Sequence, residues 1–90
     1  MATYIVGYDI HPSKGETYGD LIEAIKSYGT WWHHLDSTWL IVTDDPAAEI
    51  RNNLKKHLQS DDQLLVTKTC SVGAWTGFNE KGSQWLKDHV

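Results

Sequence analysis

The fold is predicted from one stretch near the start of the chain, Thr3-Tyr4-Ile5-Val6-Gly7-Tyr8-Asp9-Ile10. β-Branched and aromatic side chains dominate this stretch, which is typical of a β-strand. Tyr4, Val6 and Tyr8 alternate with Ile5, so both faces of the strand carry apolar residues. A strand with apolar residues on both faces is expected in the middle of a sheet and not at its edge.

After this strand, the sequence predicts a helix and then a hairpin. One apolar stripe at helical spacings of three and four ends before Gly29. It consists of Tyr18, Leu21, Ile22 and Ile25. Gly29 is placed to end the helix as a C-terminal cap. Residues 31–35 and 38–43 then read as two strands, which Asp36 and Ser37 join because their side chains can bond the backbone of a turn.

A second helix and another strand complete the core of the domain. Asp45 is expected as the helix N-cap and Pro46 as the first helical residue. Apolar residues continue the stripe of this helix to Leu58, and residues 63–70 read as a strand. The element order over residues 1–70 is therefore β-α-β-β-α-β, which predicts a ferredoxin-like α+β sandwich. Residues 71–90 are expected to form a C-terminal extension, a further strand and a helix, that packs on this domain or on a dimer partner.

Composition limits the classes of function. The chain has 90 residues and a formal charge of −4, and its eight Lys and Arg residues are scattered, so no strong electrostatic footprint for nucleic acid is present. The single cysteine, Cys70, excludes an internal disulfide and fits a reducing cytosol. No apolar run reaches membrane length. We therefore expect a cytoplasmic protein with no membrane partner.

Tryptophan is unusually frequent. Five tryptophans cannot all lie centrally in the core of so small a domain. We expect interface or binding roles for Trp31, Trp32, Trp39 and Trp75. One sheet face is also left without a helical cover, and a second subunit would supply it. A homodimer and a protein partner are both compatible with this pattern.

Asp9 is the first candidate site residue, because a carboxylate ends the predicted central strand. It either caps the turn at His11 and Pro12 or belongs to a site. In a dimer that packs through its sheets, Asp9 would approach its own copy, and two carboxylates with retained waters suit Mg²⁺ or Mn²⁺. His33 and His34 are adjacent on a strand and point to opposite faces, so they cannot chelate one ion together. A role on the sheet face or at an interface is therefore favoured for them over a metal role.

Several short motifs resemble those of a known family. They are Tyr8-Asp9-Ile10, Tyr28-Gly29 and the segment from His34 to Ile41. Together with the acidic turn before the last core strand, they resemble the small Cas-two family of CRISPR-associated endonucleases over roughly the first seventy residues. The whole chain resembles the bacterial Cas-two-like set labelled SinR family, in which Trp31-Trp32, Gly73-Ala74-Trp75 and Trp85-Leu86-Lys87-Asp88 also occur.

This resemblance implies a ferredoxin-like homodimer. It also implies that Asp9 holds Mg²⁺ for phosphodiester cleavage and that Ser37 has a structural or phosphate-contacting role. His11 and Asp36 are further second-shell candidates beside Ser37. The sequence departs from the family in its negative charge, its few matches to the DNA-binding basic residues and its tryptophan-rich tail.

Three hypotheses about function remain open at this point. The first is a Mg²⁺-dependent endonuclease dimer with Asp9 as its catalytic and metal-binding residue. The second is a non-catalytic dimeric adaptor, or protein-binding module, of the same fold. The third is a small-ligand regulatory domain of similar topology, although the sequence has no glycine-rich ligand loop.

Overall fold

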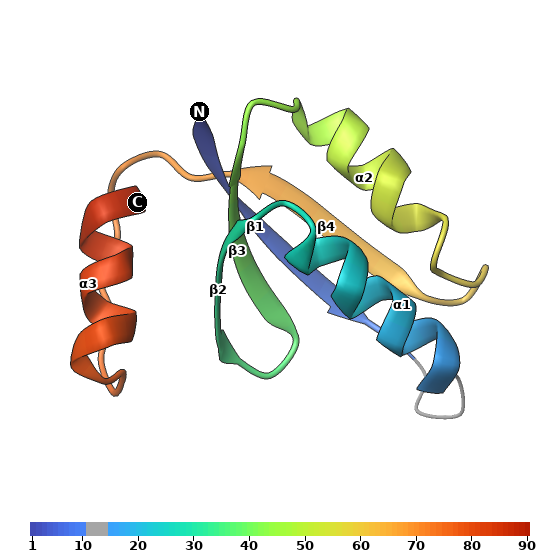
Figure 1. The fold of residues 1–90 in the computed structure, drawn as a ribbon, viewed down its shortest axis with the longest axis horizontal. Helices are drawn as coiled ribbons and strands as arrows, with labels where there is room; N and C mark the ends of the chain where they lie inside the picture. Colours follow the sequence, from blue (N-terminus) through green and yellow to red (C-terminus); the bar gives the residue numbers. More distant parts are fainter. Residues whose placement is uncertain (11–14) are drawn as a thin grey trace.

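The computed structural model describes residues 1–10 and 15–90, and it shows a small α+β domain (Figure 1). A four-stranded antiparallel sheet is combined with three helices. The elements in chain order are β1 (Ala2–Asp9), α1 (Gly15–Lys26), β2 (Thr30–Leu35), β3 (Thr38–Thr43), α2 (Ala47–Lys55), β4 (Gln63–Lys68) and α3 (Glu80–His89). The turn predicted around His11 and Pro12 lies outside the described residues.

The strand order across the sheet is β2-β3-β1-β4. β1 therefore pairs on one side with β3 and on the other with β4, both antiparallel, and the prediction that it is a central strand is confirmed. β2 and β3 form the predicted hairpin, with a register shift between Trp32 and Leu35. β2 and β4 are the edges of the sheet.

We call the side of the sheet that α1 and α2 cover the first face (Figure 1). Side chains alternate along a strand, so every second residue of β1 points to this face. They pack with both helices into one core, whose buried members are Tyr4, Val6, Tyr8, Leu21, Ile25, Trp39, Ile41, Ile50 and Leu54. Leu64 and Val66 of β4 pack against its margin. This core holds the sheet and the two helices together.

The opposite side of the sheet, the second face, carries α3 (Figure 1). Trp32, Leu40 and Leu86 form a separate buried cluster there. The Trp32 indole Nε1 donates to the carbonyl of Gly82 at 3.1 Å, which fixes the start of α3 over β2. At the other end of α3, the hydroxyl of Thr3 donates to the carbonyl of His89. The C-terminal extension therefore packs on the second face of its own chain.

Three local predictions are wrong. The second helix was expected to continue to Leu58, but α2 ends at Lys55. Residues 71–79, for which a further strand was expected, contain no strand, because left-handed backbone at Ser71 (φ 67°) and Gly77 (φ 91°) interrupts extended structure. The N-cap of α2 is Pro46 and not Asp45. Pro46 has an extended ψ of 160°, and its carbonyl accepts from the amides of Glu49 and Ile50. Gly29 has the left-handed backbone (φ 90°) predicted for a helix stop.

Over residues 1–10 and 15–90, no helix combines the length and the apolar character that crossing a bilayer would require.

Candidate functional site

Asp9 is the last residue of β1, and its side chain is exposed. It lies opposite Gln63 of β4 in the strand register. Ile5 packs against the second-face cluster, so alternation along β1 places Gly7 and Asp9 on the second face as well. The predicted site residue is thus at the open end of the face that α3 only partly covers.

The turn with Asp36 and Ser37 comes close to this end of β1. The backbone amide of Tyr8 donates to the carbonyl of Ser37 at 3.1 Å. The structure therefore brings Ser37 beside the strand that carries Asp9, through backbone and not through the serine hydroxyl. His33 Nε2 lies 3.2 Å from the carbonyl of Asp36, whose side chain is exposed. His11, the remaining second-shell candidate, lies outside the described residues.

The two adjacent histidines of β2 have separate surroundings. The ring of His33 stacks on Trp39 of β3, with centroids 3.8 Å apart and an interplanar angle of 11°. His34 instead contacts Trp32 at 5.0 Å between centroids, on the side of α3. The prediction that these histidines point to opposite faces is confirmed. Among residues 1–10 and 15–90, no three His, Cys, Asp or Glu side chains are grouped so as to hold an ion.

Gly7 and Leu65 form an open, apolar patch next to Asp9. They lie opposite each other in the pairing of β1 with β4. The Leu65 side chain is 63% exposed, and a Cβ built on Gly7 would meet no atom within 4 Å. Glycine weakens a strand interior and often marks a position where another backbone or a ligand approaches. Among the residues that the structure describes, none comes within 4 Å of this position.

Sequence reasoning missed this patch, although its signal was present. Gly7 interrupts an otherwise bulky strand, but the sequence does not show that no described residue fills the space beside it.

The four tryptophans assigned to interface or binding roles have different environments. Trp39 is 1% exposed and Trp32 is 4% exposed, so both belong to the packing of this chain. Trp31 is 38% exposed, and the ammonium of Lys26 lies 5.5 Å from the centroid of its ring. Trp75 is partly buried on the second face. Only Trp31 and Trp75 therefore present substantial surface to a partner.

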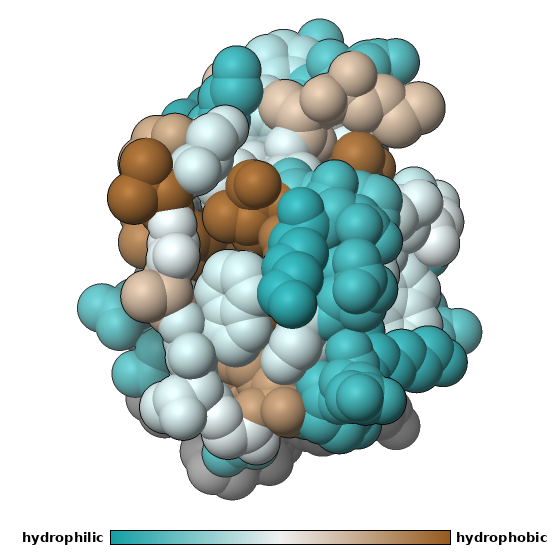
Figure 2. Space-filling view, turned by 90° about the vertical axis from the view of Figure 1, so that its left-hand side faces the viewer, coloured by the Kyte–Doolittle hydropathy of each residue, from teal (hydrophilic) through white to brown (hydrophobic). Residues whose placement is uncertain are grey.

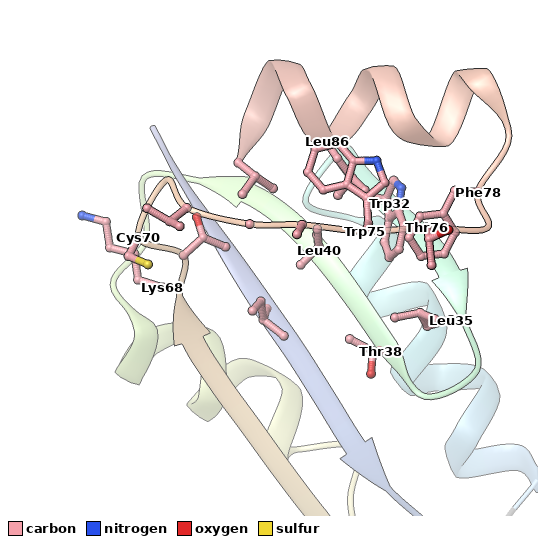
Figure 3. Close-up of a pocket in the computed structure, with 16 residues that line it drawn as sticks. Trp32, Leu35, Thr38, Leu40, Lys68, Cys70, Trp75, Thr76, Phe78 and Leu86 are labelled. Carbon is pink, nitrogen blue, oxygen red and sulfur yellow. The ribbon is translucent and has the colours of Figure 1, made fainter.

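A groove of about 490 Å³ runs over the second face. The sheet, including Thr38 and Leu40, forms the floor of the groove. Its walls are α3 and the segment 70–78 (Figure 3). Figure 2 shows the molecule from the side of α3, where several hydrophobic patches are exposed between weakly polar and hydrophilic residues. Val72, 82% exposed, belongs to the groove lining. The groove and the patch at Gly7 together leave much of the second face without a cover from this chain.

No protein-family model matches the chain. No solved structure gives a significant match to it either.

Proposed function

We propose that this protein is a homodimeric binding module, an adaptor, whose second sheet face packs against a second copy. One observation carries the proposal: the glycine in the central strand, Gly7, faces open space beside the exposed side chain of Leu65. A second copy packed there would bury Leu65. Its close approach would also explain why a residue without a side chain stands at position 7. Stable interfaces of this kind bury on the order of 1,000 Å² or more.

We propose the ferredoxin-like fold for the domain, as the resemblance to the Cas-two-like proteins implies. In its favour, the order of elements before α3 is β-α-β-β-α-β. The central positions of β1 and β3, with the hairpin strand β2 and the last strand β4 at the edges, also agree with a split β-α-β topology. Both α1 and α2 cover one face, which leaves the other available for a partner (Figure 1).

The adaptor function is tested by the oligomeric state. Light scattering of the parent at micromolar concentration is expected to give twice the chain mass. Leu65→Glu would place a charge in the interface and should give the mass of a monomer. Asn52→Glu, which adds the same charge at an exposed position of α2, is the control and should remain a dimer. A monomeric parent protein would end the proposal.

A second candidate is a Mg²⁺- or Mn²⁺-dependent endonuclease, and the position of Asp9 favours it. Asp9 lies on the same strand face as Gly7, two residues away, so a dimer formed through that patch would bring two Asp9 carboxylates toward its axis. A shared ion would polarise a scissile phosphate and activate a water molecule. The backbone of Ser37, close to β1, would support the strand end and not the chemistry.

Cleavage assays distinguish the two candidates. An endonuclease should cut DNA or RNA with Mg²⁺ or Mn²⁺, and both EDTA and Asp9→Asn should abolish the activity. Asp20→Asn, which changes an exposed carboxylate of α1 that belongs to neither candidate site, is the matched control for an unspecific loss of charge. A dimeric protein that cleaves neither nucleic acid under these conditions would be an adaptor alone.

A further inference from the structure

We propose that the first face of the sheet carries a binding site for a single free nucleotide, at the point where the end of α1 meets the edge strand β2. Trp31 and His33 hold the base by stacking, and Lys26 holds the phosphate. Neither proposed function uses this site, because the patch at Gly7 and the carboxylate of Asp9 both lie on the second face.

Three aromatic rings form a continuous surface beside α1. Trp31 and His33 are two positions apart on β2, and both of their rings meet Trp39 of β3 on the first face. His33 stacks on Trp39 with centroids 3.8 Å apart, whereas Trp31 is inclined to Trp39 by 57° at 5.2 Å. Trp39 is buried, but Trp31 is exposed and His33 is partly exposed. The rings at this margin of the sheet therefore extend a stack that begins in the core.

These rings line a hollow of about 460 Å³, together with Ile22 and Lys26 of α1. The volume falls in the range of small-molecule sites. The His33 ring is already oriented, because it stacks on Trp39 and its Nε2 lies 3.2 Å from the carbonyl oxygen of Asp36. A carbonyl oxygen only accepts, so this ring nitrogen is the donor. A ring that is oriented in advance loses less conformational freedom when a ligand stacks on it.

The charge of the lining selects an anion. Among the described residues that line the hollow, Lys26 and His33 are the only titratable ones, and no Asp or Glu belongs to the lining. The Lys26 ammonium lies 5.5 Å from the centroid of the Trp31 ring, so the cation is beside the stacking surface. A phosphate there gains a charge-assisted hydrogen bond. A planar base that carries a phosphate matches both the rings and the lysine.

The site fits one nucleotide better than a strand. Proteins that bind single strands combine stacking rings with a positively charged groove that follows the backbone. The described lining contributes one lysine here, and the whole chain has a formal charge of −4. Further phosphates of a strand would find no second lysine in this lining, so a free nucleotide is the expected ligand.

Adenosine monophosphate and adenosine are matched probes, because they differ only in the phosphate. Amide chemical shifts of isotope-labelled protein at the end of α1 and in β2 report both affinities. Lys26→Gln should weaken binding of adenosine monophosphate by about tenfold and leave adenosine within about twofold. Lys87→Gln, at an exposed position of α3, is the control and should change neither affinity. An affinity for adenosine monophosphate that is indifferent to Lys26→Gln would overturn the assignment.

A second pair of variants tests the stacking surface. Trp31→Ala should weaken binding of both probes by about tenfold, whereas Trp31→Phe, which keeps a ring, should stay within about threefold of the parent. If Trp31→Ala does not fold, the shifts in the parent locate the probe instead, and shifts confined to the second face would contradict the site.

A short oligodeoxyadenylate separates a free nucleotide from a strand. It should bind within about tenfold of adenosine monophosphate, because one base and one phosphate meet the site. Tighter binding than this would overturn the assignment to a free nucleotide. Leu65→Glu should leave the affinity for adenosine monophosphate unchanged, so the failure of the dimer and the failure of this site are separable.

Discussion

The indole Nε1 of Trp39 donates a hydrogen bond to the hydroxyl oxygen of Tyr8 at 3.1 Å inside the main core. The two residues come from neighbouring strands, since Trp39 lies opposite Val6 in the β1–β3 register. Both side chains are buried on the first face, beneath α1 and α2. The largest side chain of the core thus has its polar atom satisfied without reaching solvent, which allows a tryptophan to be fully buried there.

Trp39→Ala should lower the free energy of unfolding by about 3–5 kcal/mol, because it leaves a large cavity beneath the helices. Tyr8→Phe removes the acceptor of the indole N–H and should cost about 1–3 kcal/mol. Urea denaturation followed by circular dichroism measures both. A Trp39→Ala variant that unfolds like the parent would contradict a core role for this residue.

A double-mutant cycle of Gly82 and His34 tests whether the His34 ring limits how closely α3 approaches β2. A Cβ on Gly82 would lie 3.1 Å from two atoms of the His34 ring, which itself packs near Trp32 and Phe78. Alanine favours a helix over glycine by about 1 kcal/mol, but the crowded ring opposes this gain. We expect Gly82→Ala to destabilise the parent and to stabilise the His34→Ala variant.

Thermal melts of the parent, the two single variants and the double variant complete this cycle. An equal effect of Gly82→Ala in both backgrounds would show that the histidine ring does not limit the approach of α3.

Gly7→Ala should have opposite effects on the folded chain and on the proposed dimer. The added methyl would meet no described residue of its own chain within 4 Å, so the lower entropy of the unfolded state should stabilise the monomer by about 0.5–1 kcal/mol. Across the proposed interface the same methyl would separate the two sheets and weaken association. Denaturation at low protein concentration and sedimentation at high concentration measure the two effects. Association unchanged by Gly7→Ala would argue against close approach at this position.

Asp9→Asn tests the metal hypothesis without an activity assay. If two Asp9 carboxylates face each other in a dimer, their repulsion disappears in the variant, and the melting temperature without metal should stay the same or rise. Mn²⁺ should then stabilise the parent and not the variant. Melting curves of both proteins, with and without Mn²⁺, provide the measurement. If Mn²⁺ leaves both unchanged, the endonuclease hypothesis is abandoned.

Local patterns of the sequence were sufficient to predict most elements. The apolar stripe before Gly29 predicted α1, and the alternating strands around Asp36 and Ser37 predicted the hairpin. The central position of β1 followed from its two apolar faces. These signals work because helix and strand periodicities are set by the backbone within one element.

The candidate sites were less accessible to prediction. Asp9 was found from its place at the end of a strand, but the open patch beside it depends on Leu65, more than fifty residues away in the chain. The groove is lined by residues of all four strands, of α3 and of the segment 69–78. No local pattern shows which of these residues meet.

The sequence alone was enough for the order of strands and helices up to β4, the central place of β1 and the absence of an internal disulfide, because each depends on short-range periodicity or on composition. The tertiary structure was needed to show that α3 packs on the second face around Trp32 while Leu65, opposite Gly7, stays exposed. Local sequence patterns could not predict this position of α3, because contacts between residues far apart in the chain hold the helix in place. The indole of Trp32 bonds the carbonyl of Gly82, and Thr3 bonds the carbonyl of His89 across almost the whole chain.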